Sequence, residues 1–137
     1  MSFSPLVMFD GDCEEAFLFY QRVFDGSLRL LRYSEAPLLE QPAVALNNKI
    51  MMAQLTVDGQ ELLGCDTSET MHQPQQGMLV SWQGETEAQV QEIFALLSEG
   101  GMIRKPLDYT FWTPLYGVVE DRFGMVWMLS CRVQSSN

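Results

Sequence analysis

The second half of the chain repeats the pattern of the first half at a constant spacing, and this repeat constrains the fold more than any other feature. Each copy contains an amphipathic helix that follows one extended segment and precedes three others. The same order of elements twice predicts a duplicated βαβββ module within one α+β domain of residues 1–137. Module 1 is expected over about residues 4–66, a polar linker over 67–75 and module 2 over 76–132. The aligned pairs are Gly11 with Gly84, Asp12 with Glu85, Glu14 with Glu87, Phe17 with Val90, Tyr20 with Ile93, and Phe24 with Leu97.

The first helix is predicted over residues 13–24, where apolar side chains recur at helical spacing. Asp12 can cap its first turn, Glu15 completes an acidic capping box, and Gly26 ends the helix. A helix N-terminus lowers the pKa of a nearby thiol, so Cys13 is a candidate nucleophile. No histidine lies near Cys13 in the sequence to act as its base, and we therefore favour a structural role for it.

The second helix is predicted over residues 87–98, with Thr86 as its cap and Gln89 in the capping-box position. The Asp-Gly dipeptide at residues 58–59 is typical of a two-residue β-hairpin turn. A second turn is expected over residues 121–124. The expected extended segments are 5–9, 27–33, 50–57 and 61–66 in module 1, and 77–82, 102–108, 111–120 and 125–132 in module 2.

The charge of the chain excludes several classes of partner. It carries 18 acidic and 8 basic residues, a formal net charge of −10, and no run of basic residues. Nucleic acids and anionic membranes are therefore not expected as partners, because both are bound through clustered lysine and arginine. No apolar stretch approaches the roughly 20 residues that span a bilayer, and the N-terminus lacks the features of a signal peptide. With 3 widely spaced cysteines and no C-x-x-C motif, we expect a cytoplasmic protein with reduced thiols.

Alternation along the predicted strands separates side chains that face a helix from those that face away from it. In the strand over residues 50–57, Ala53 and Leu55 would pack beneath the helix, while Met52 and Gln54 would point away. The outward face mixes apolar and polar side chains, which suits either the lining of a ligand cleft or an ordinary buried core. In module 2 the same rule directs Met78, Val80, Trp82, Trp127 and Leu129 toward the helix, and Gly77, Leu79, Ser81, Val126, Met128 and Ser130 away from it.

Three segments carry a resemblance to a known superfamily: FDGDCEEAFLFYQRVF at residues 9–24, IMMAQLTVDG at 50–59 and FWTPLYGVVEDRFGMVWML at 111–129. Together they resemble the vicinal oxygen chelate superfamily, which includes glyoxalase I, extradiol dioxygenases such as dihydroxybiphenyl dioxygenase, and the fosfomycin- and bleomycin-resistance proteins. Within it, the chain is most similar to the PhnB-like branch, often labelled 3-demethylubiquinone-9 3-methyltransferase domains. The resemblance implies two βαβββ modules that form a curved mixed-sheet cleft, with packing related to the ferredoxin-like fold, and a homodimer.

Active members of this superfamily hold one divalent metal ion through His, Gln or Glu side chains, and the metal binds adjacent oxygens of the substrate. The matching positions in this sequence are Pro5, Gly64, Gly77 and Met128, none of which offers a side-chain nitrogen or oxygen ligand. The single histidine, His72, lies in the polar linker, where we expect it to be exposed. We therefore predict no metal bound in the family manner and no cofactor. The methyltransferase label has no supporting site, because no Gly-x-Gly turn follows a strand.

The first functional hypothesis is that the cleft binds a small apolar or planar molecule without metal, as in resistance proteins that sequester a drug. Methionine and aromatic side chains adapt well to such ligands. Asp66, at a strand end, would meet a cationic group of the ligand at the mouth of the cleft. The predicted cleft residues are Phe9, Met52, Gln54, Asp66, Leu79, Phe111, Trp112, Tyr116 and Met128.

The second hypothesis is an enzyme of the superfamily, either a divalent-metal lyase or dioxygenase with atypical ligands or a metal-free catalyst. Such an enzyme needs a general base, for which the candidates are Asp10, Asp66, Asp108 and Glu120. The third hypothesis is a degenerate relative whose surface serves protein association. We rank the three in this order, and the pairing of the modules within or between chains stays open.

Overall fold

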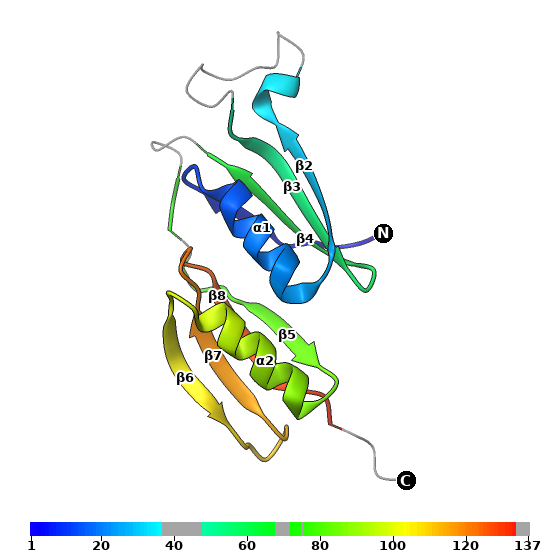
Figure 1. The fold of residues 1–137 in the computed structure, drawn as a ribbon, viewed down its shortest axis with the longest axis vertical. Helices are drawn as coiled ribbons and strands as arrows, with labels where there is room; N and C mark the ends of the chain where they lie inside the picture. The colour runs from blue at the N-terminus through cyan, green and yellow to red at the C-terminus, as the bar shows by residue number, and fades with distance from the viewer. Residues whose placement is uncertain (37–47, 68–71, 75, 134–137) are drawn as a thin grey trace. The chain divides into compact units, whose positions relative to one another are not determined.

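The computed structural model describes two compact units, one in each half of the chain, and each is considered separately. In its described residues, each unit places one helix across one face of a four-stranded sheet (Figure 1). The duplicated βαβββ module predicted from the repeat is therefore confirmed. The units cover Met1–Gln73 and Pro74–Asn137, and the described residues are 1–36, 48–67, 72–74 and 76–133.

The first unit has the sheet order β1-β4-β3-β2, so the first strand lies beside the last. The first strand runs parallel to β4, and the other neighbours in the sheet are antiparallel. Helix α1 and strand β3 have the bounds predicted from the sequence. The elements are β1 (Leu6–Phe9), α1 (Cys13–Phe24), β2 (Ser27–Arg32), the 3-10 turn η1 (Tyr33–Glu35), β3 (Ile50–Val57) and β4 (Gln60–Asp66).

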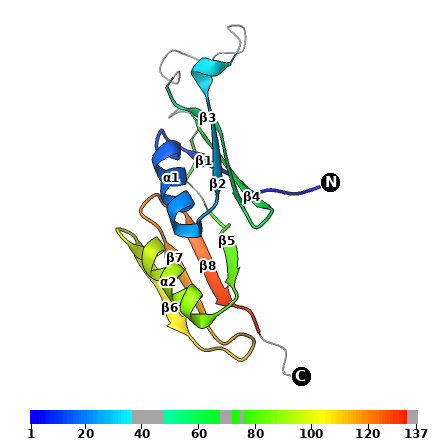
Figure 2. The ribbon, with the colours of Figure 1, turned by 45° about the vertical axis from the view of Figure 1, so that its right-hand side comes forward.

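The second unit repeats this topology with the sheet order β5-β8-β7-β6, again with the first strand parallel to the last (Figure 2). Two predicted strands need correction. The first strand starts at Val80 rather than at residue 77, and the third starts at Tyr116 because the residues from Thr110 to Thr113 form a turn closed by a backbone hydrogen bond of 3.1 Å. The elements are β5 (Val80–Gly84), α2 (Glu87–Ser98), β6 (Met102–Asp108), β7 (Tyr116–Glu120) and β8 (Val126–Cys131).

Each helix buries its apolar stripe against its own sheet. In the first unit Phe17 and Tyr20 are fully buried, and α1 comes so close to β4 that a Cβ on Gly64 would lie 2.3 Å from the Phe17 ring. In the second unit Val90 and Leu97 are fully buried on α2. Figure 2 shows both helices lying along their sheets, so in each unit the other sheet face carries no helix among the described residues.

The two helices begin differently. The side chain of Thr86 caps α2 as predicted, because its Oγ1 accepts a hydrogen bond of 3.1 Å from the Gln89 backbone N–H. The expected side-chain cap from Asp12 on α1 is not formed. The end of α1 also differs from the prediction, since Asp25 rather than glycine adopts the left-handed conformation, with φ 53°. Gly26 follows it at a point where a Cβ would lie 2.6 Å from the carbonyl oxygen of Thr56.

The hairpin between β3 and β4 is confirmed in detail. Asp58 and Gly59 both have positive φ angles, 50° and 76°, as a type I′ turn requires. None of the described helices has the length and apolar character needed to cross a membrane.

Candidate functional site

The sheet face opposite the helix, called the open face below, is the candidate ligand surface in each unit. In the first unit it carries Met52 and Gln54, as predicted, while their neighbours Ala53 and Leu55 are buried beneath α1. Leu6 and Met8 of β1 lie on the same face, and the exposed fractions of Leu6, Met8 and Met52 are 51%, 43% and 37%. This face therefore presents accessible apolar side chains beside the polar pair Gln54 and Glu61, whose side chains are hydrogen-bonded.

The open face of the second unit also mixes apolar and polar side chains. Trp127 and Leu129 of β8 are buried toward α2, which leaves Met128 and Ser130 on the other side. The register pairs Met128 with Val118 and Ser130 with Tyr116 on the neighbouring strand β7. Residues that pair across neighbouring strands share a face. Tyr116 and Met128 therefore share one sheet face, and their role in binding a ligand stays a prediction.

Three aromatic side chains are called the aromatic cluster: Trp112 contacts both Phe111 and Tyr116. The ring centroids of Phe111 and Trp112 are 5.1 Å apart, and those of Trp112 and Tyr116 are 5.4 Å apart, both edge to face. Phe111 is 98% exposed and Trp112 is 53% exposed. The Nζ atom of Lys105 lies 5.6 Å from the centroid of the Tyr116 ring, within cation–π range.

A buried threonine fixes the segment that carries the cluster. The Thr113 hydroxyl lies 2.6 Å from the carbonyl oxygen of Cys131 at the end of β8, which accepts its hydrogen bond. The Thr113 backbone N–H also donates to the hydroxyl of Thr110 at 3.0 Å. Sequence reasoning missed both Thr113 and Lys105. Nothing in the sequence marks Thr113. Lys105 lies within a correctly predicted strand, but its position beside Val118 depends on the register of β6 with β7, which the sequence does not show.

Two of the predicted cleft residues lie elsewhere. Phe9 is buried beneath α1, with its ring edge to face against Phe17 at 6.0 Å. Asp66 is 1% exposed, and its Oδ1 accepts hydrogen bonds of 3.0 Å from the backbone N–H groups of Gly11 and Cys13. The Asp66 carboxylate, not that of Asp12, therefore satisfies the first N–H groups at the start of α1. Leu79 precedes β5 and is exposed, and Met78, which was expected to pack beneath α2, is also exposed because β5 starts only at Val80.

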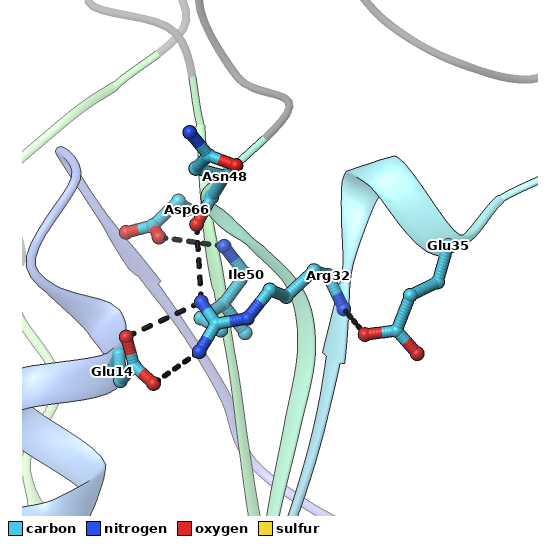
Figure 3. Close-up of polar contacts among 6 residues, drawn as sticks. All are labelled: Glu14, Arg32, Glu35, Asn48, Ile50 and Asp66. Carbon is cyan, nitrogen blue, oxygen red and sulfur yellow. Dashed lines mark hydrogen bonds and ion pairs between the residues drawn. The ribbon is translucent and has the colours of Figure 1, made fainter.

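The second oxygen of Asp66 is also engaged, so this carboxylate does not face a ligand. Its Oδ2 accepts a hydrogen bond of 2.9 Å from the backbone N–H of Ile50 at the start of β3 (Figure 3). Beside it, the Arg32 guanidinium forms an ion pair with Glu14 of α1 and donates to the Asn48 carbonyl at 3.1 Å. These contacts join α1, β2 and β3, and they have a structural role.

The cysteine at the start of α1 is not an activated nucleophile. Cys13 is fully buried, and burial, followed by the negative charge of Asp66, raises the pKa of its thiol. The sequence-based expectation of a lowered pKa is therefore wrong, because desolvation of the thiolate outweighs the favourable helix terminus. Of the proposed general bases, Glu120 is paired with Arg104, and the Asp108 carboxylate accepts a hydrogen bond of 2.8 Å from the Tyr109 backbone.

The residues at the metal positions of the superfamily do not fit a divalent ion. Gly64 has no room for a side chain, because Phe17 of α1 occupies the space that a Cβ would need. Met128 offers only a thioether, a poor ligand for hard cations. Within the described ranges, no three His, Cys, Asp or Glu side chains are grouped as a metal would require. His72 is half-buried rather than exposed, and its Nδ1 is buried without a hydrogen-bond partner among the described residues.

Comparison with known proteins gives consistent relationships. Residues 1–130 match the family described as 3-demethylubiquinone-9 3-methyltransferase. The chain is 32% identical to protein PA1353 from Pseudomonas aeruginosa, with a TM-score of 0.89 and coverage of 96% of this chain and 98% of that one. It is 26% identical to a putative 3-demethylubiquinone-9 3-methyltransferase, PhnB protein, from Bacillus cereus, with a TM-score of 0.76 and coverage of 96% and 100%. A glyoxalase/bleomycin resistance protein/dioxygenase family enzyme from Burkholderia phytofirmans shares the fold at 12% identity, with a TM-score of 0.67 and coverage of 95% and 97%.

Proposed function

This chain belongs to the PhnB-like 3-demethylubiquinone-9 3-methyltransferase family, within the glyoxalase/bleomycin resistance/dioxygenase fold, and we propose that it binds a small planar molecule without a divalent metal. The observation that supports this proposal is the exposed aromatic cluster of the second unit. Phe111, Trp112 and Tyr116 present ring faces and edges, and Met128 lies on the same open sheet face as Tyr116.

A planar ring suits this surface for a physical reason. Aromatic side chains gain about 0.5–1.5 kcal/mol from each well-placed aromatic contact beyond the area they bury. Thr113 anchors the backbone segment that carries Phe111 and Trp112 before any ligand arrives, so ordering of this segment costs less at the moment of binding. The family description names an enzyme for 3-demethylubiquinone, whose ring is planar, and only the planar ring is carried over to this proposal.

The ligand is expected to be neutral rather than strongly anionic. The net charge of −10 repels anions over the whole molecule. The cation–π contact of Lys105 with Tyr116 places one positive charge at the cluster, and Asp108 pairs with Tyr116 across the ladder, so the local charges balance. A cationic ligand is not expected, because both oxygens of the buried Asp66 carboxylate accept backbone hydrogen bonds.

The proposal is tested by isothermal titration calorimetry with 2-naphthol, a neutral planar phenol. We expect saturable binding that Tyr116→Leu weakens about tenfold, because loss of one aromatic contact of about 1.4 kcal/mol has that effect. Trp112→Leu should act in the same direction. Decahydro-2-naphthol, which has the same carbon skeleton without planarity, should bind more weakly than 2-naphthol.

The matched control is Tyr109→Leu. Tyr109 is an aromatic residue of the same segment, 71% exposed, and it lies outside the aromatic cluster as defined. Its replacement should leave the affinity for 2-naphthol unchanged. Non-saturable heats, or an equal loss in the Tyr109 and Tyr116 variants, would contradict the proposal.

A further inference from the structure

Three sulfur-containing side chains lie in one row across the open face of the first unit. Met8 of β1 pairs with Cys65 of β4 in the parallel ladder, so their side chains share a face. The antiparallel ladder of β3 and β4 ends at the pair Ala53 and Gly64, and the same register continued by one residue sets Met52 beside Cys65. The order β1-β4-β3 therefore places the cysteine between the two methionines.

The spacing of this row allows the three sulfur atoms to meet. Neighbouring strands lie about 4.8 Å apart, and methionine side chains are long, unbranched and flexible. Met8 and Met52 are both partly exposed, whereas Cys65 between them is half-buried. An ion arriving from solvent can therefore contact all three sulfurs without a change in the sheet.

The surroundings of the row favour a soft ion over a hard one. Leu6 and Leu63 pair in the adjacent row of the same face, and Leu31 pairs with Met52 on the β2 side. Thiolate and thioether ligands select Cu(I) and similar soft ions, whereas Mg²⁺, Ca²⁺ and Mn²⁺ require oxygen ligands. The superfamily's metal positions lack ligands for a divalent ion, whereas this row offers sulfur ligands that suit a soft ion.

We propose that Met8, Cys65 and Met52 form a binding site for a soft monovalent metal ion, Cu(I) or its analogue Ag(I). Binding replaces the S–H bond of Cys65 by a sulfur–metal bond, and the thiol proton passes to solvent while the metal keeps its oxidation state. The thioethers bind as neutral ligands and release nothing. The prediction of no metal concerned the divalent ion of the superfamily, and this site differs from it in both ligands and ion. It lies in a different unit from the aromatic cluster.

The other cysteines provide an internal comparison. Cys13 and Cys131 are both buried, so a metal ion in solvent does not reach their sulfur atoms in the folded protein. A small thiol-specific reagent should therefore react with Cys65 before it reacts with Cys13 or Cys131. The folded protein is expected to bind one Cu(I) per chain.

The test is a competition for Cu(I) between the full chain and a chromogenic Cu(I) chelator, without oxygen and with a reductant that contains no thiol. Cys65→Ser should abolish the competition and the ultraviolet charge-transfer band of the copper–thiolate bond. The double variant Met8→Leu/Met52→Leu should lower the affinity by about tenfold or more, equivalent to about 1.4 kcal/mol for each tenfold step. Ag(I) should raise the melting temperature of the parent protein and not of Cys65→Ser.

The control is Met78→Leu/Met102→Leu, which replaces two exposed methionines outside the first unit. It should leave the affinity for Cu(I) unchanged, as should Tyr116→Leu, which separates this proposal from the ligand site of the second unit. Far-ultraviolet circular dichroism checks that each variant is folded. Retained binding in Cys65→Ser, or an unchanged affinity in the double methionine variant, would overturn the proposal.

Discussion

A single buried carboxylate, that of Asp66, joins the start of α1 to the start of β3. It accepts hydrogen bonds from the backbone N–H groups of Gly11, Cys13 and Ile50 at 2.9–3.0 Å. Backbone donors at a helix start have no partner within the helix, so a buried acceptor there replaces the water that the fold excludes. This explains why an acidic side chain occupies a fully buried position beside an apolar core.

We predict that Asp66→Asn destabilises the protein by about 3 kcal/mol, because the substitution removes a charge and leaves a buried N–H group unpaired. The change keeps the size of the side chain, so packing is not altered. Urea denaturation followed by circular dichroism measures the loss. Asp10→Asn, at an exposed carboxylate close in sequence, is the control and should change stability by less than about 0.5 kcal/mol. Equal stability of the two variants would contradict the assigned role.

The second residue-scale prediction concerns the reactivity of the thiols. Burial raises the pKa of Cys13, and burial with the nearby Asp66 charge raises the pKa of Cys65. Because only the thiolate reacts, a raised pKa lowers the reactive fraction near neutral pH, and the rate should increase as the pH rises. With a disulfide reagent at pH 7 we expect slow labelling of the folded protein and rapid labelling of all 3 cysteines in urea. Half-buried Cys65 should be labelled before the two buried thiols, and a thiol that reacts as fast in the folded protein as in urea would contradict these shifts.

Helix α1 packs closely against strand β4 because Gly64 has no side chain. A Cβ on Gly64 would lie 2.3 Å from the Phe17 ring and 3.3 Å from the Cys13 sulfur. Interiors are packed too densely to absorb such an overlap without displacement of the helix. The glycine that stands at a metal position of the superfamily therefore serves helix packing here.

We predict that Gly64→Ala destabilises the protein by about 1–3 kcal/mol through overpacking. Phe17→Leu shortens the side chain that the new methyl group would meet, so it should recover part of the loss when the two changes are combined. Thermal unfolding of the two single variants and the double variant gives the coupling. Additive losses would show that the Gly64 position does not press on Phe17.

The elements show what sequence patterns can and cannot predict. The bounds of α1, α2, β3 and β6 follow directly from apolar periodicity and turn residues. The start of β7 does not, because the residues before Tyr116 look extended in the sequence, whereas the Thr110–Thr113 turn and the hydrogen bond of Thr113 to Cys131 of β8 direct them away from the sheet. For the candidate site, alternation correctly predicts that Met52 and Met128 face away from the helices, and Tyr116 is predicted from its aromatic ring, whereas the role of Asp66 depends on partners up to 55 residues away.

At the scale of the whole molecule, charge and exposed apolar surface have opposite effects on self-association. Each chain carries a net charge of −10, so two copies repel each other at low ionic strength. Phe3, Met78 and Phe111 are among the large apolar side chains that are exposed, and association would remove such surface from water. Salt screens the repulsion and leaves the apolar contribution in place.

We therefore expect the homodimer implied by the family resemblance, with a stability that increases with salt. Size-exclusion chromatography with light scattering should give 31.2 kDa, twice the 15.6 kDa of one chain, at about 0.15 M salt. At about 0.01 M salt the longer screening length should shift the equilibrium toward the 15.6 kDa monomer. An interface held mainly by ion pairs would respond in the opposite direction and dissociate as salt is added. A mass of one chain at every salt concentration would exclude the dimer, and binding of 2-naphthol or Cu(I) would then be a property of the monomer.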